Sequence, residues 1–325
     1  MTPRRPRLFL IDGSSYIYRA FFALPPAVNS AGFPTNATYG FINFMLKLLK
    51  RHRPEYLAVV LDAGRETFRS QTFADYKTNR PQPPASLLLQ LPYIRRALDG
   101  FNVLGLELQG YEADDLIGTL CEKLCDQGCD LIVVSSDKDL MQLVTDKVRL
   151  FDGRKERWID AREVIARFGV GPDKLAEVLG LMGDAVDNIP GVKGVGRKTA
   201  IALMQQFCGL EDLYANLDQL QQGNLRGLAR LREALRNGKE TAFLSRDLAT
   251  IRKNVPIQIE LEQLFFKGPN RDKLRSLFAE LEFNNLVKLL DNGLAFTSDL
   301  GLARVPQKPV PKESLSIQLQ LFSWK

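Results

Sequence analysis

Acidic residues recur in this chain at places where they could do chemistry together. Glu112, Asp114 and Asp115 crowd into one short segment, although the chain of 325 residues has a net charge of +6. Acidic side chains in the first turn of a helix complement the helix dipole, so this segment alone is explained equally well as a helix start. Six further aspartates bear on the choice: Asp12, Asp62, Asp137, Asp139, Asp184 and Asp187.

Several of these aspartates follow short apolar runs that are typical of buried parallel strands, at Arg7–Ile11, Tyr56–Leu61 and Asp130–Ser135. An aspartate after a single strand is usually a turn residue or a helix cap. Here three strands each deliver one, and the carboxyl ends of parallel strands share the sheet edge where ligands bind. Glu112–Asp115 opens a predicted helix leading to the third strand, so the same edge can receive it.

Nine carboxylates at one edge would repel one another strongly unless cations neutralised them. Oxygen ligands select hard ions, so we expect Mg²⁺ or Mn²⁺ rather than zinc. Asp184 and Asp187 are three residues apart and are expected to face the same way from one helical turn. So many carboxylates suggest two ions, about 3.5–4 Å apart, an arrangement that suits in-line hydrolysis of a phosphodiester.

Histidine and cysteine offer no competing chemistry. His52 is the only histidine, and its place among basic residues at a predicted helix end indicates a solvated side chain. His-based zinc cages are therefore excluded, and a Ser-His-Asp triad is not expected. The cysteines are expected to be reduced and structural: Cys121, Cys125 and Cys129, spaced along one side of a predicted helix, and the distant Cys208. The apolar run LFLI near the amino terminus is too short for a secretory signal, and no apolar run is long enough to cross a bilayer, so a cytoplasmic protein is expected.

Basic charge gathers in the second part of the chain. Residues 191–325 hold 20 Lys and Arg against 14 Asp and Glu, and residues 1–190 hold 24 against 24, so the net +6 lies entirely after residue 190. Within 223–253, helical spacing puts Arg226 with Arg230, and Arg232 with Arg236, on shared faces. Such a segment is either a solvated helix or a surface that follows a phosphate backbone.

The segment GVKGVGRKT superficially resembles a Walker A loop. Arg197 stands where that motif has its lysine, however, and no strand precedes the segment, so a nucleotide-binding loop is not expected. It is either an ordinary interhelical turn or a turn whose glycines and following helix amino terminus approach DNA phosphates without reading sequence. In the second case the contacts come from Gly191, Lys193, Gly194, Gly196, Arg197 and Lys198.

The order of the patterns predicts the architecture. Over the first 150 residues, apolar runs alternate with helical periodicity, which favours an α/β fold with a parallel sheet. Residues 170–290 are expected to be mainly helical and packed against that sheet. Beyond about Asp291 the chain is rich in proline and is expected to be a flexible tail.

Six motifs resemble, in order, those of the 5′ nuclease domain of bacterial DNA polymerase I, in the flap endonuclease family: LIDGSSYIYRAFFALPP, VVLDAG, FADYKTNRP, YEADDLIGTL, SSDKDLMQLV and GDAVDNIPGVKGVGRKTA. The resemblance covers about Leu8 to Leu290. It implies a PIN-like α/β core with a parallel sheet flanked by helices and a helical arch (1–170), a helical DNA-binding region with a helix-hairpin-helix (171–290), and a tail (291–325). Only 34 residues follow Asp291, so we expect a freestanding nuclease without the polymerase.

The resemblance also implies roles for the site residues. One metal would be bound mainly by Asp12, Asp62, Glu112 and Asp114, and the other by Asp137, Asp139, Asp184 and Asp187, with Asp115 nearby. The arch motif falls on Tyr76, Lys77 and Arg80: Tyr76 would contact the DNA, Lys77 the scissile phosphate, and Arg80 would help to hold the 5′ end of the strand. The glycine turn falls on the hairpin motif, which in relatives can also hold K⁺ through backbone carbonyls. Ser136 stands where the family often has glycine.

Together these features predict a structure-specific 5′ nuclease, a metal-dependent 5′-3′ exonuclease and flap endonuclease. Its substrates would be flaps, nicked ends and RNA primers in Okazaki fragment processing and DNA repair, and a monomer is expected. One alternative is a non-catalytic DNA-structure-binding replication accessory protein, which would have no reason to keep nine acids facing a phosphate polymer. A small-molecule phosphohydrolase, suggested by FLIDGSS alone, would leave the basic helical half unexplained and lacks the DxD spacing.

The tail contains a second motif, QLQLF, at 318–322. It resembles the peptide by which bacterial replication proteins bind the sliding clamp, and its contacts would come from Gln318, Leu319, Leu321 and Phe322. An apolar anchor on a flexible linker suits such docking. The alternative is a strand or helix that folds back onto the domain.

Overall fold

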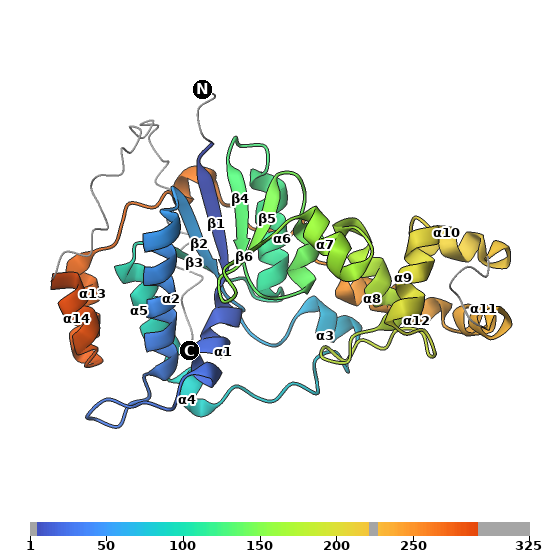
Figure 1. Cartoon of the computed structure of the whole chain (residues 1–325). Helices are drawn as coiled ribbons and strands as arrows, with labels where there is room; N and C mark the ends of the chain where they lie inside the picture. Colours follow the sequence, from blue (N-terminus) through green and yellow to red (C-terminus); the bar gives the residue numbers. More distant parts are fainter. Residues whose placement is uncertain (1–4, 221–226, 292–325) are drawn as a thin grey trace.

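The computed structural model describes residues 5–220 and 227–291, built around one six-stranded sheet (Figure 1). Across the sheet the strands follow the order β3-β2-β1-β4-β5-β6. Neighbours from β3 to β5 are parallel, and β6 runs antiparallel to β5. The strands are β1 (Arg7–Asp12), β2 (Tyr56–Val60), β3 (Leu104–Leu106), β4 (Asp130–Val134), β5 (Val148–Asp152) and β6 (Arg157–Ile159).

The three predicted strands are β1, β2 and β4, and they lie side by side in the middle of the sheet. Phe9 of β1 pairs with Leu57 of β2 on one side and with Ile132 of β4 on the other. β3, β5 and β6 were not predicted: β3 and β6 have only three residues each, and the apolar run of β5 is interrupted by the exposed Arg149. The parallel α/β fold is confirmed, and the carboxyl ends of the three central strands share one edge.

Helices cover both faces of this sheet. Because strand side chains alternate, Phe9 and Ile11 pack into one hydrophobic core and Leu8 and Leu10 into another. The Phe9 face is covered by α1 (Gly13–Ala23), α2 (Asn36–His52), α5 (Leu91–Gly100), α13 (Arg271–Glu280) and α14 (Asn284–Asp291). The Leu8 face is covered first by α6 (Ala113–Leu124) and the 3₁₀ helix η1 (Asp139–Leu143).

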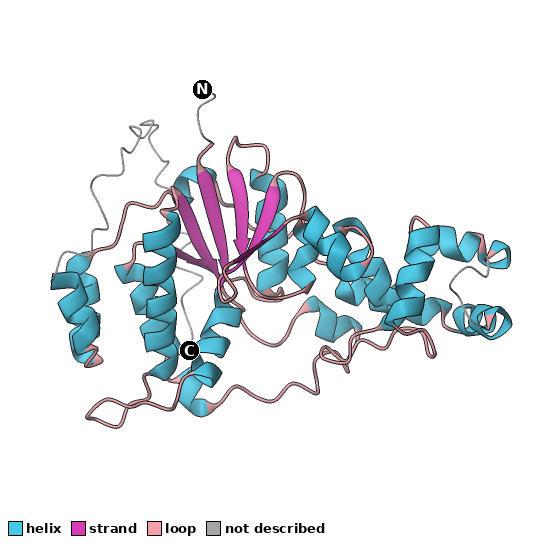
Figure 2. Ribbon diagram, viewed as in Figure 1, coloured by secondary structure: helices cyan, strands magenta, loops and turns pink. Residues whose placement is uncertain are grey.

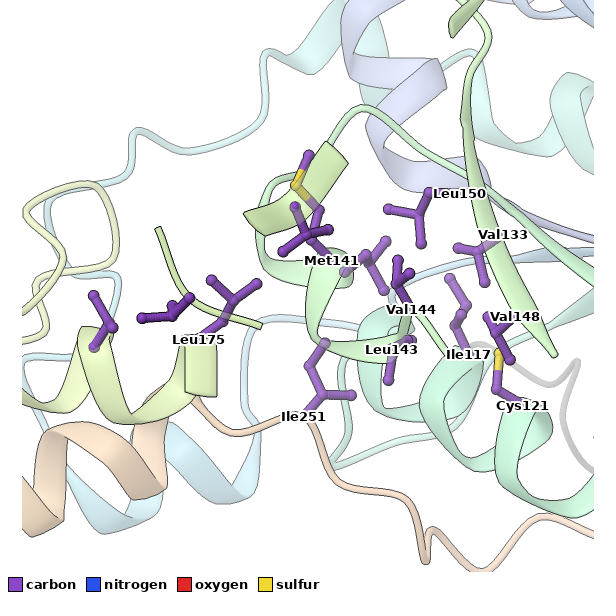
Figure 3. Close-up of a cluster of buried hydrophobic side chains, with 14 of the residues drawn as sticks. Ile117, Cys121, Val133, Met141, Leu143, Val144, Val148, Leu150, Leu175 and Ile251 are labelled. Atoms are coloured by element: carbon purple, nitrogen blue, oxygen red, sulfur yellow. The ribbon is translucent and has the colours of Figure 1, made fainter. Parts of the chain in front are cut away.

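A helical region extends sideways from the second face, without strands in its described residues (Figure 2). It comprises α7 (Ala161–Phe168), η2 (Pro172–Lys174), α8 (Leu175–Met182), α9 (Arg197–Gln206), α10 (Leu210–Ala215), η3 (Leu217–Gln219), α11 (Leu228–Asn237) and α12 (Lys239–Ala249). One core joins it to the sheet, since Leu175 and Ile251 belong to the same cluster as Val133 and Val148 (Figure 3). After η4 (Leu261–Leu264), the chain returns to the sheet as α13 and α14.

The segment expected to form a helical arch contains little helix in this structure. It holds two short helices, α3 (Phe68–Thr72) and α4 (Ala85–Leu88), joined by a chain of turns (Figure 1). Pro81, Pro83 and Pro84 lie in the connection, and proline removes the N–H that a continuing helix needs. Lys77 also adopts a left-handed backbone with φ of 54°, which interrupts a right-handed helix.

Cys121 and Cys129 are buried, as expected of structural cysteines, but Cys208 is exposed, and the three closely spaced cysteines do not all lie on one helix. All four cysteines are free. Cys121 lies within α6, Cys125 follows its last residue, and Cys129 precedes β4. Burial raises the pKa of the Cys121 thiol to about 12, so this thiol is unreactive. In the part of the chain that the structure describes, we find no helix with the length and apolar character of a membrane span.

The prediction that the His52 side chain is solvated is wrong. His52 does end α2, but it is only 8% exposed, because its ring packs against Phe9, Phe151 and Trp158. The apolar neighbours come from β1, β5 and β6, of which two strands were not predicted. Burial, followed by the charges of Arg51 and Arg7, lowers the pKa of His52 below its usual 6.5.

This burial makes stability pH-dependent. The unfolded chain takes up a proton at His52 near pH 6.5, whereas the folded protein resists protonation until a lower pH. We therefore expect the free energy of unfolding of the wild type to fall below pH 6.5 relative to His52→Phe, by at most about 1.4 kcal/mol per pH unit. Urea titrations of both proteins at pH 7.5 and 5.5 measure the difference. A constant difference between the two proteins would contradict the prediction.

Candidate active site

Asp12 stands at the end of the central strand β1 and is held there by two neighbours. Its Oδ1 accepts a hydrogen bond from the Ser15 N–H at 3.1 Å, which caps α1. Its Oδ2 accepts one from the Ser135 hydroxyl at 2.6 Å. The side chain is almost fully buried, and burial, assisted by the carboxylates of Asp62 and Asp137, raises the pKa of Asp12 to about 7. Its negative charge is thus poorly compensated.

Asp62 follows β2, and Asp114 lies in the first turn of α6, where these two elements are in contact. The Asp62 Oδ1 accepts a hydrogen bond from the Ala113 N–H at 2.9 Å, and this holds the first turn of α6 against the end of β2. Burial raises the pKa of Asp114 well above its usual value, and the nearby carboxylates of Asp137 and Asp12 add to the effect. The start of α6 therefore reaches the same edge as the strand ends, as predicted.

Asp137 and Asp139 continue the cluster beyond β4. The Asp137 N–H donates to the Ser135 hydroxyl at 2.9 Å, so Ser135 connects Asp12 with this loop. The Asp139 N–H donates to Asp137 Oδ1, also at 2.9 Å. Burial raises the pKa of Asp139 to about 7, and the carboxylates of Asp137, Asp187 and Asp184 contribute in the same direction.

Asp184 and Asp187 come from the connection between α8 and α9. The prediction that they share one helical turn is wrong. They lie on a tight turn that Asp184 and Ile189 close with two backbone hydrogen bonds of 2.9 and 2.8 Å. Gly183, with φ of 71°, ends α8 before the turn. Both carboxylates are buried. Lys138 donates to Asp184, and Arg80 donates to Asp187.

Glu112 and the arch residues meet at the same place. The Lys77 Nζ lies 2.6 Å from Glu112 Oε1 and 3.7 Å from Asp187 Oδ2, and the hydroxyl of Tyr76 donates to Glu112 at 3.2 Å. Burial opposes ionisation of Glu112, but the charges of Lys77 and Arg69 outweigh it and hold the pKa of Glu112 below its usual value. Tyr76 itself is buried, in a small cluster with Leu179 and Leu248 among others, so its ring packs inside the protein.

Asp115 is the one predicted ligand that the structure directs away from the cluster. Its carboxylate is fully buried and pairs with Arg69 at 2.6 and 2.8 Å. Eight of the nine acids therefore surround the edge, and Asp115 lies in the interior next to them, paired with Arg69. Among the described residues, no three acidic, histidine or cysteine side chains converge as closely as a ready-made metal cage requires.

These residues nevertheless fit hard divalent cations. The available donors are carboxylate oxygens, which such ions prefer. Burial, and after it the charge of neighbouring carboxylates, raises the pKa values of Asp12, Asp114 and Asp139. A cation placed among these side chains would lower each pKa again, and this is the electrostatic condition for binding.

The glycine hairpin divides into a buried and an exposed part. Gly191 is buried, and a Cβ on it would lie 2.3 Å from the Gly183 nitrogen, so it serves close backbone packing. Gly194 and Gly196 face open space, and Gly196 precedes α9 without a side-chain cap. The basic residues of the hairpin are all exposed: Lys193, Arg197 and Lys198. The exposed part therefore offers backbone N–H groups and positive charge on one surface.

Arg167 is an addition to this surface that the sequence did not reveal. The guanidinium groups of Arg167 and Arg197 both lie over the Phe168 ring, 5.3 and 5.2 Å from its centroid. Arg197 Nη2 also donates to the Arg167 carbonyl at 2.8 Å. Arginines 30 positions apart give no pattern in the sequence, and only the packing of α7 on the start of α9 brings them together.

Other basic residues of the second half are partly used inside the protein. Arg232 donates to the carbonyls of Asp218 and Leu220, and Arg236 pairs with the Asp218 carboxylate. They hold η3 against α11, while Arg230 is exposed. Arg226 and the tail residues Gln318, Leu319, Leu321 and Phe322 lie outside the described residues.

Two further residues that contact the acids, Ser135 and Lys138, were not predicted from the sequence. Ser135 orients Asp12 and Asp137, and Lys138 pairs with Asp184. Their position within SSDKD, at the end of a predicted strand, was the available signal. Ser136, which departs from the family pattern, accepts a hydrogen bond from Arg19 and does not adopt a positive φ. Its backbone thus has no need of glycine.

Comparisons of the sequence with protein families identify two adjoining regions. Residues 7–169 match the 5′-3′ exonuclease N-terminal resolvase-like domain, and residues 170–272 match the 5′-3′ exonuclease C-terminal SAM fold. A 5′-3′ exonuclease of Aquifex aeolicus is 41% identical over 284 residues, 87% of this chain and 95% of the relative. DNA polymerase I of Bacillus subtilis is also 41% identical, over 294 residues, and the match spans 89% of this chain but 33% of the polymerase.

Solved structures agree with this fold. A bacteriophage T5 5′-exonuclease with bound divalent zinc superposes with a TM-score of 0.59 at 22% identity, over 88% of this chain and 98% of the other. The catalytic core of Rad2, solved with a DNA substrate, superposes with a TM-score of 0.58 at 17% identity, over 88% and 92% of the two chains. From the family domains that cover residues 7–272 and the Aquifex relative, we conclude that this chain belongs to the 5′-3′ exonuclease family.

Proposed function

We propose that the protein is a structure-specific 5′ nuclease that acts as a 5′-3′ exonuclease and flap endonuclease. The observation that carries the proposal is the convergence of carboxylates from β1, β2, α6, the β4 loop and the α8–α9 turn on one sheet edge. Family membership supports it, as does the exposed basic hairpin that continues from the same turn. A non-catalytic DNA-binding role would leave the uncompensated acids without a purpose, since they repel phosphate.

The acids would hold divalent ions in two groups, for which Mg²⁺ is the proposed ion. One group would consist mainly of Asp12, Asp62, Glu112 and Asp114, and the other of Asp137, Asp139, Asp184 and Asp187. Bound there, such ions supply Lewis acidity toward the phosphate and a water molecule that ionises near neutral pH. A K⁺ ion at the carbonyls of the hairpin is proposed in addition.

The chain's own residues would prepare the reaction. Ser135 and the Ser15 N–H hold Asp12, and the Ala113 N–H holds Asp62, so that both carboxylates keep a fixed direction. Lys77 and Arg80 stand over the acids as cations, paired with Glu112 and Asp187 in this structure. We propose that they exchange these partners for the phosphates of the substrate, near the scissile bond and toward the 5′ end.

The substrate's duplex would lie along the hairpin and α9. Exposed N–H groups at Gly194 and Gly196, together with Lys193, Arg197 and Lys198, would contact its phosphates and carry no sequence preference. Arg167 would add a further contact from α7. The proposed substrates are DNA flaps, nicks and RNA primers, handled during Okazaki fragment processing and repair in the cytoplasm by a monomer.

Clamp binding through Gln318, Leu319, Leu321 and Phe322 stays a proposal based on the sequence. A pull-down on immobilised sliding clamp tests it by comparing the full chain with a chain that ends at Ser314. Equal retention of the two proteins would exclude this peptide as the anchor.

Cleavage assays test the proposed function directly. Labelled 5′-flap, nicked and single-stranded DNA are incubated with the protein, with Mg²⁺ or with a chelator. We expect cutting of the flap and nick near the junction in Mg²⁺, weak cutting of the single strand, and none with the chelator. Equal cutting of all three DNAs would contradict the proposed structure specificity, and cutting in the presence of the chelator would contradict the metal-dependent mechanism.

The contact proposed for Arg167 has a distinct salt signature. Each phosphate contact by a basic side chain releases about one counterion, so Arg167→Gln should reduce the slope of log K against log salt concentration by about 1. Fluorescence anisotropy with nicked DNA in Ca²⁺ over several KCl concentrations gives this slope. Arg275→Gln, on α13 at the opposite side of the sheet, is the control and should keep the wild-type slope. A wild-type slope in both variants would exclude the Arg167 contact.

A further inference from the structure

A buried ion pair between Arg69 and Asp115 lies directly behind the acidic edge. Arg69 is 2% exposed and Asp115 is 0% exposed. The guanidinium donates from Nη1 to Oδ2 at 2.6 Å and from Nη2 to Oδ1 at 2.8 Å. The same two oxygens also accept from the backbone N–H groups of Arg252 at 2.8 Å and Glu112 at 3.2 Å. Protein donors thus occupy both oxygens of Asp115, which leaves them poorly placed to bind a metal ion.

The other donors of Arg69 reach a third segment of the chain. Its Nε donates to the Leu248 carbonyl and its Nη2 to the Thr250 carbonyl, both at 2.8 Å. The guanidiniums of Arg69 and Arg252 also lie 4.5 and 5.1 Å from the ring centroid of the neighbouring Phe68. One side chain therefore ties α3 to the start of α6 and to the chain that leaves α12.

Each of these three segments carries a different part of the proposed machinery. The start of α6 bears Glu112 and Asp114. The turns after α3 bear Lys77 and Arg80. The helix α12 packs along α8, and its Ser245 hydroxyl accepts the Gly191 N–H at 2.9 Å, which connects it to the turn with Asp184 and Asp187 and to the hairpin beyond. Arg69 thus connects the acids of α6, the arch segment and the DNA-binding helices.

We propose that Asp115 and Arg69 are positioning residues, and that Asp115 is not a metal ligand. Their pair keeps the acids of α6 in register with the arch segment and the helical DNA-binding region. A bidentate pair of this kind fixes orientation as well as distance, and catalytic groups tolerate displacements of only a fraction of an ångström. The inference rests on the proposed function, because it concerns where that function's groups are held.

A double-mutant cycle tests the pair. Asp115→Asn and Arg69→Met are each expected to slow single-turnover cleavage of a 5′ flap by about 10–100-fold, as the loss of a supporting partner does. The double variant is expected to be no slower than the slower single variant, since both remove one interaction. If Asp115→Asn does not fold by circular dichroism, Arg69→Lys replaces it in the comparison. It keeps the charge without the bidentate geometry and should give an intermediate rate.

A second readout separates positioning from metal binding. The number of Mn²⁺ ions bound per chain, measured by equilibrium dialysis without DNA, should be the same in Asp115→Asn and the wild type. Arg96→Met removes a bidentate pair with Glu280 between α5 and α13 and is the matched control, expected to cut at the wild-type rate.

Three results would overturn the proposal: loss of a Mn²⁺ ion in Asp115→Asn, wild-type cleavage by Asp115→Asn, or effects that multiply in the double variant. If the wild type itself did not cut flaps, the proposed function would fail. The ion count and a thermal-unfolding cycle on the same variants would still show whether Asp115 binds metal and whether it is coupled to Arg69.

Discussion

Asp114→Asn is expected to reduce cleavage by about a thousandfold or more while DNA binding stays measurable. Asparagine has the same shape but removes one negative charge from the cluster that would hold the divalent ions. Losing about 4 kcal/mol of the charge stabilisation that a metal site provides corresponds to a thousandfold in rate. Single-turnover cleavage of a labelled 5′ flap in Mg²⁺ gives the rate, and anisotropy in Ca²⁺ gives the binding.

Asp12→Asn is expected to behave in the same way. Asp12 caps α1 through the Ser15 N–H, but asparagine caps a helix about as well as aspartate, so the fold should be kept. Asp160→Asn is the matched control, because Asp160 caps α7 through the Glu163 N–H at 2.9 Å and lies outside the acid cluster. It should cut at nearly the wild-type rate. Cleavage by Asp12→Asn or Asp114→Asn within tenfold of the wild type would refute the assignment.

Gly191→Ala is expected to lower the free energy of unfolding by about 3 kcal/mol or more, through overpacking and a strained backbone. Its φ is +63°, and an added Cβ would lie 2.3 Å from the Gly183 nitrogen and 2.5 Å from the Met182 carbonyl carbon. Both are backbone atoms, so no side chain can rotate to relieve the overlap. The turn with Asp184 and Asp187 would have to open. Urea unfolding followed by circular dichroism measures the loss.

Two neighbouring glycines separate the causes of that loss. Gly194 has φ of +88° but open space around its Cβ position, so Gly194→Ala should cost only the strain of a left-handed alanine, about 1–2 kcal/mol. Gly196 has open space and a φ of −90°, so Gly196→Ala should change stability least of the three. If Gly191→Ala were as stable as Gly196→Ala, the close packing of Gly191 on Gly183 would be excluded.

The sequence alone identified the three central strands and predicted that the acids which follow them would lie at one sheet edge. This was possible because a buried parallel strand is apolar over its whole length, and parallel strands bring residues that follow them to one edge. The three-residue strands β3 and β6, and β5 with its exposed Arg149, left no comparable pattern. Their absence from the prediction also hid the aromatic neighbours that bury His52.

The role of each side chain within a motif depended on contacts that spacing does not encode. Asp114 and Asp115 are adjacent in the chain, yet one belongs to the acid cluster and the other pairs with Arg69 from α3. Successive side chains on a helix point about 100° apart. Whether each of them meets an interaction partner depends on elements that are distant in the sequence. For the same reason Tyr76 packs inside the protein while its neighbour Lys77 joins the acids.

The hairpin shows the same division. Its glycines and basic residues were visible as a motif, but the motif could not distinguish Gly191, which packs against Gly183, from Gly194 and Gly196, which face open space. Nor could it join Arg167 to Arg197. Sequence by itself predicted the parallel α/β core and the chemical character of the acidic edge from local periodicity and residue type, and its motifs carried the resemblance to the family. The tertiary structure alone decided which of these residues face the edge and which hold it in place, because that depends on packing between segments far apart in the chain.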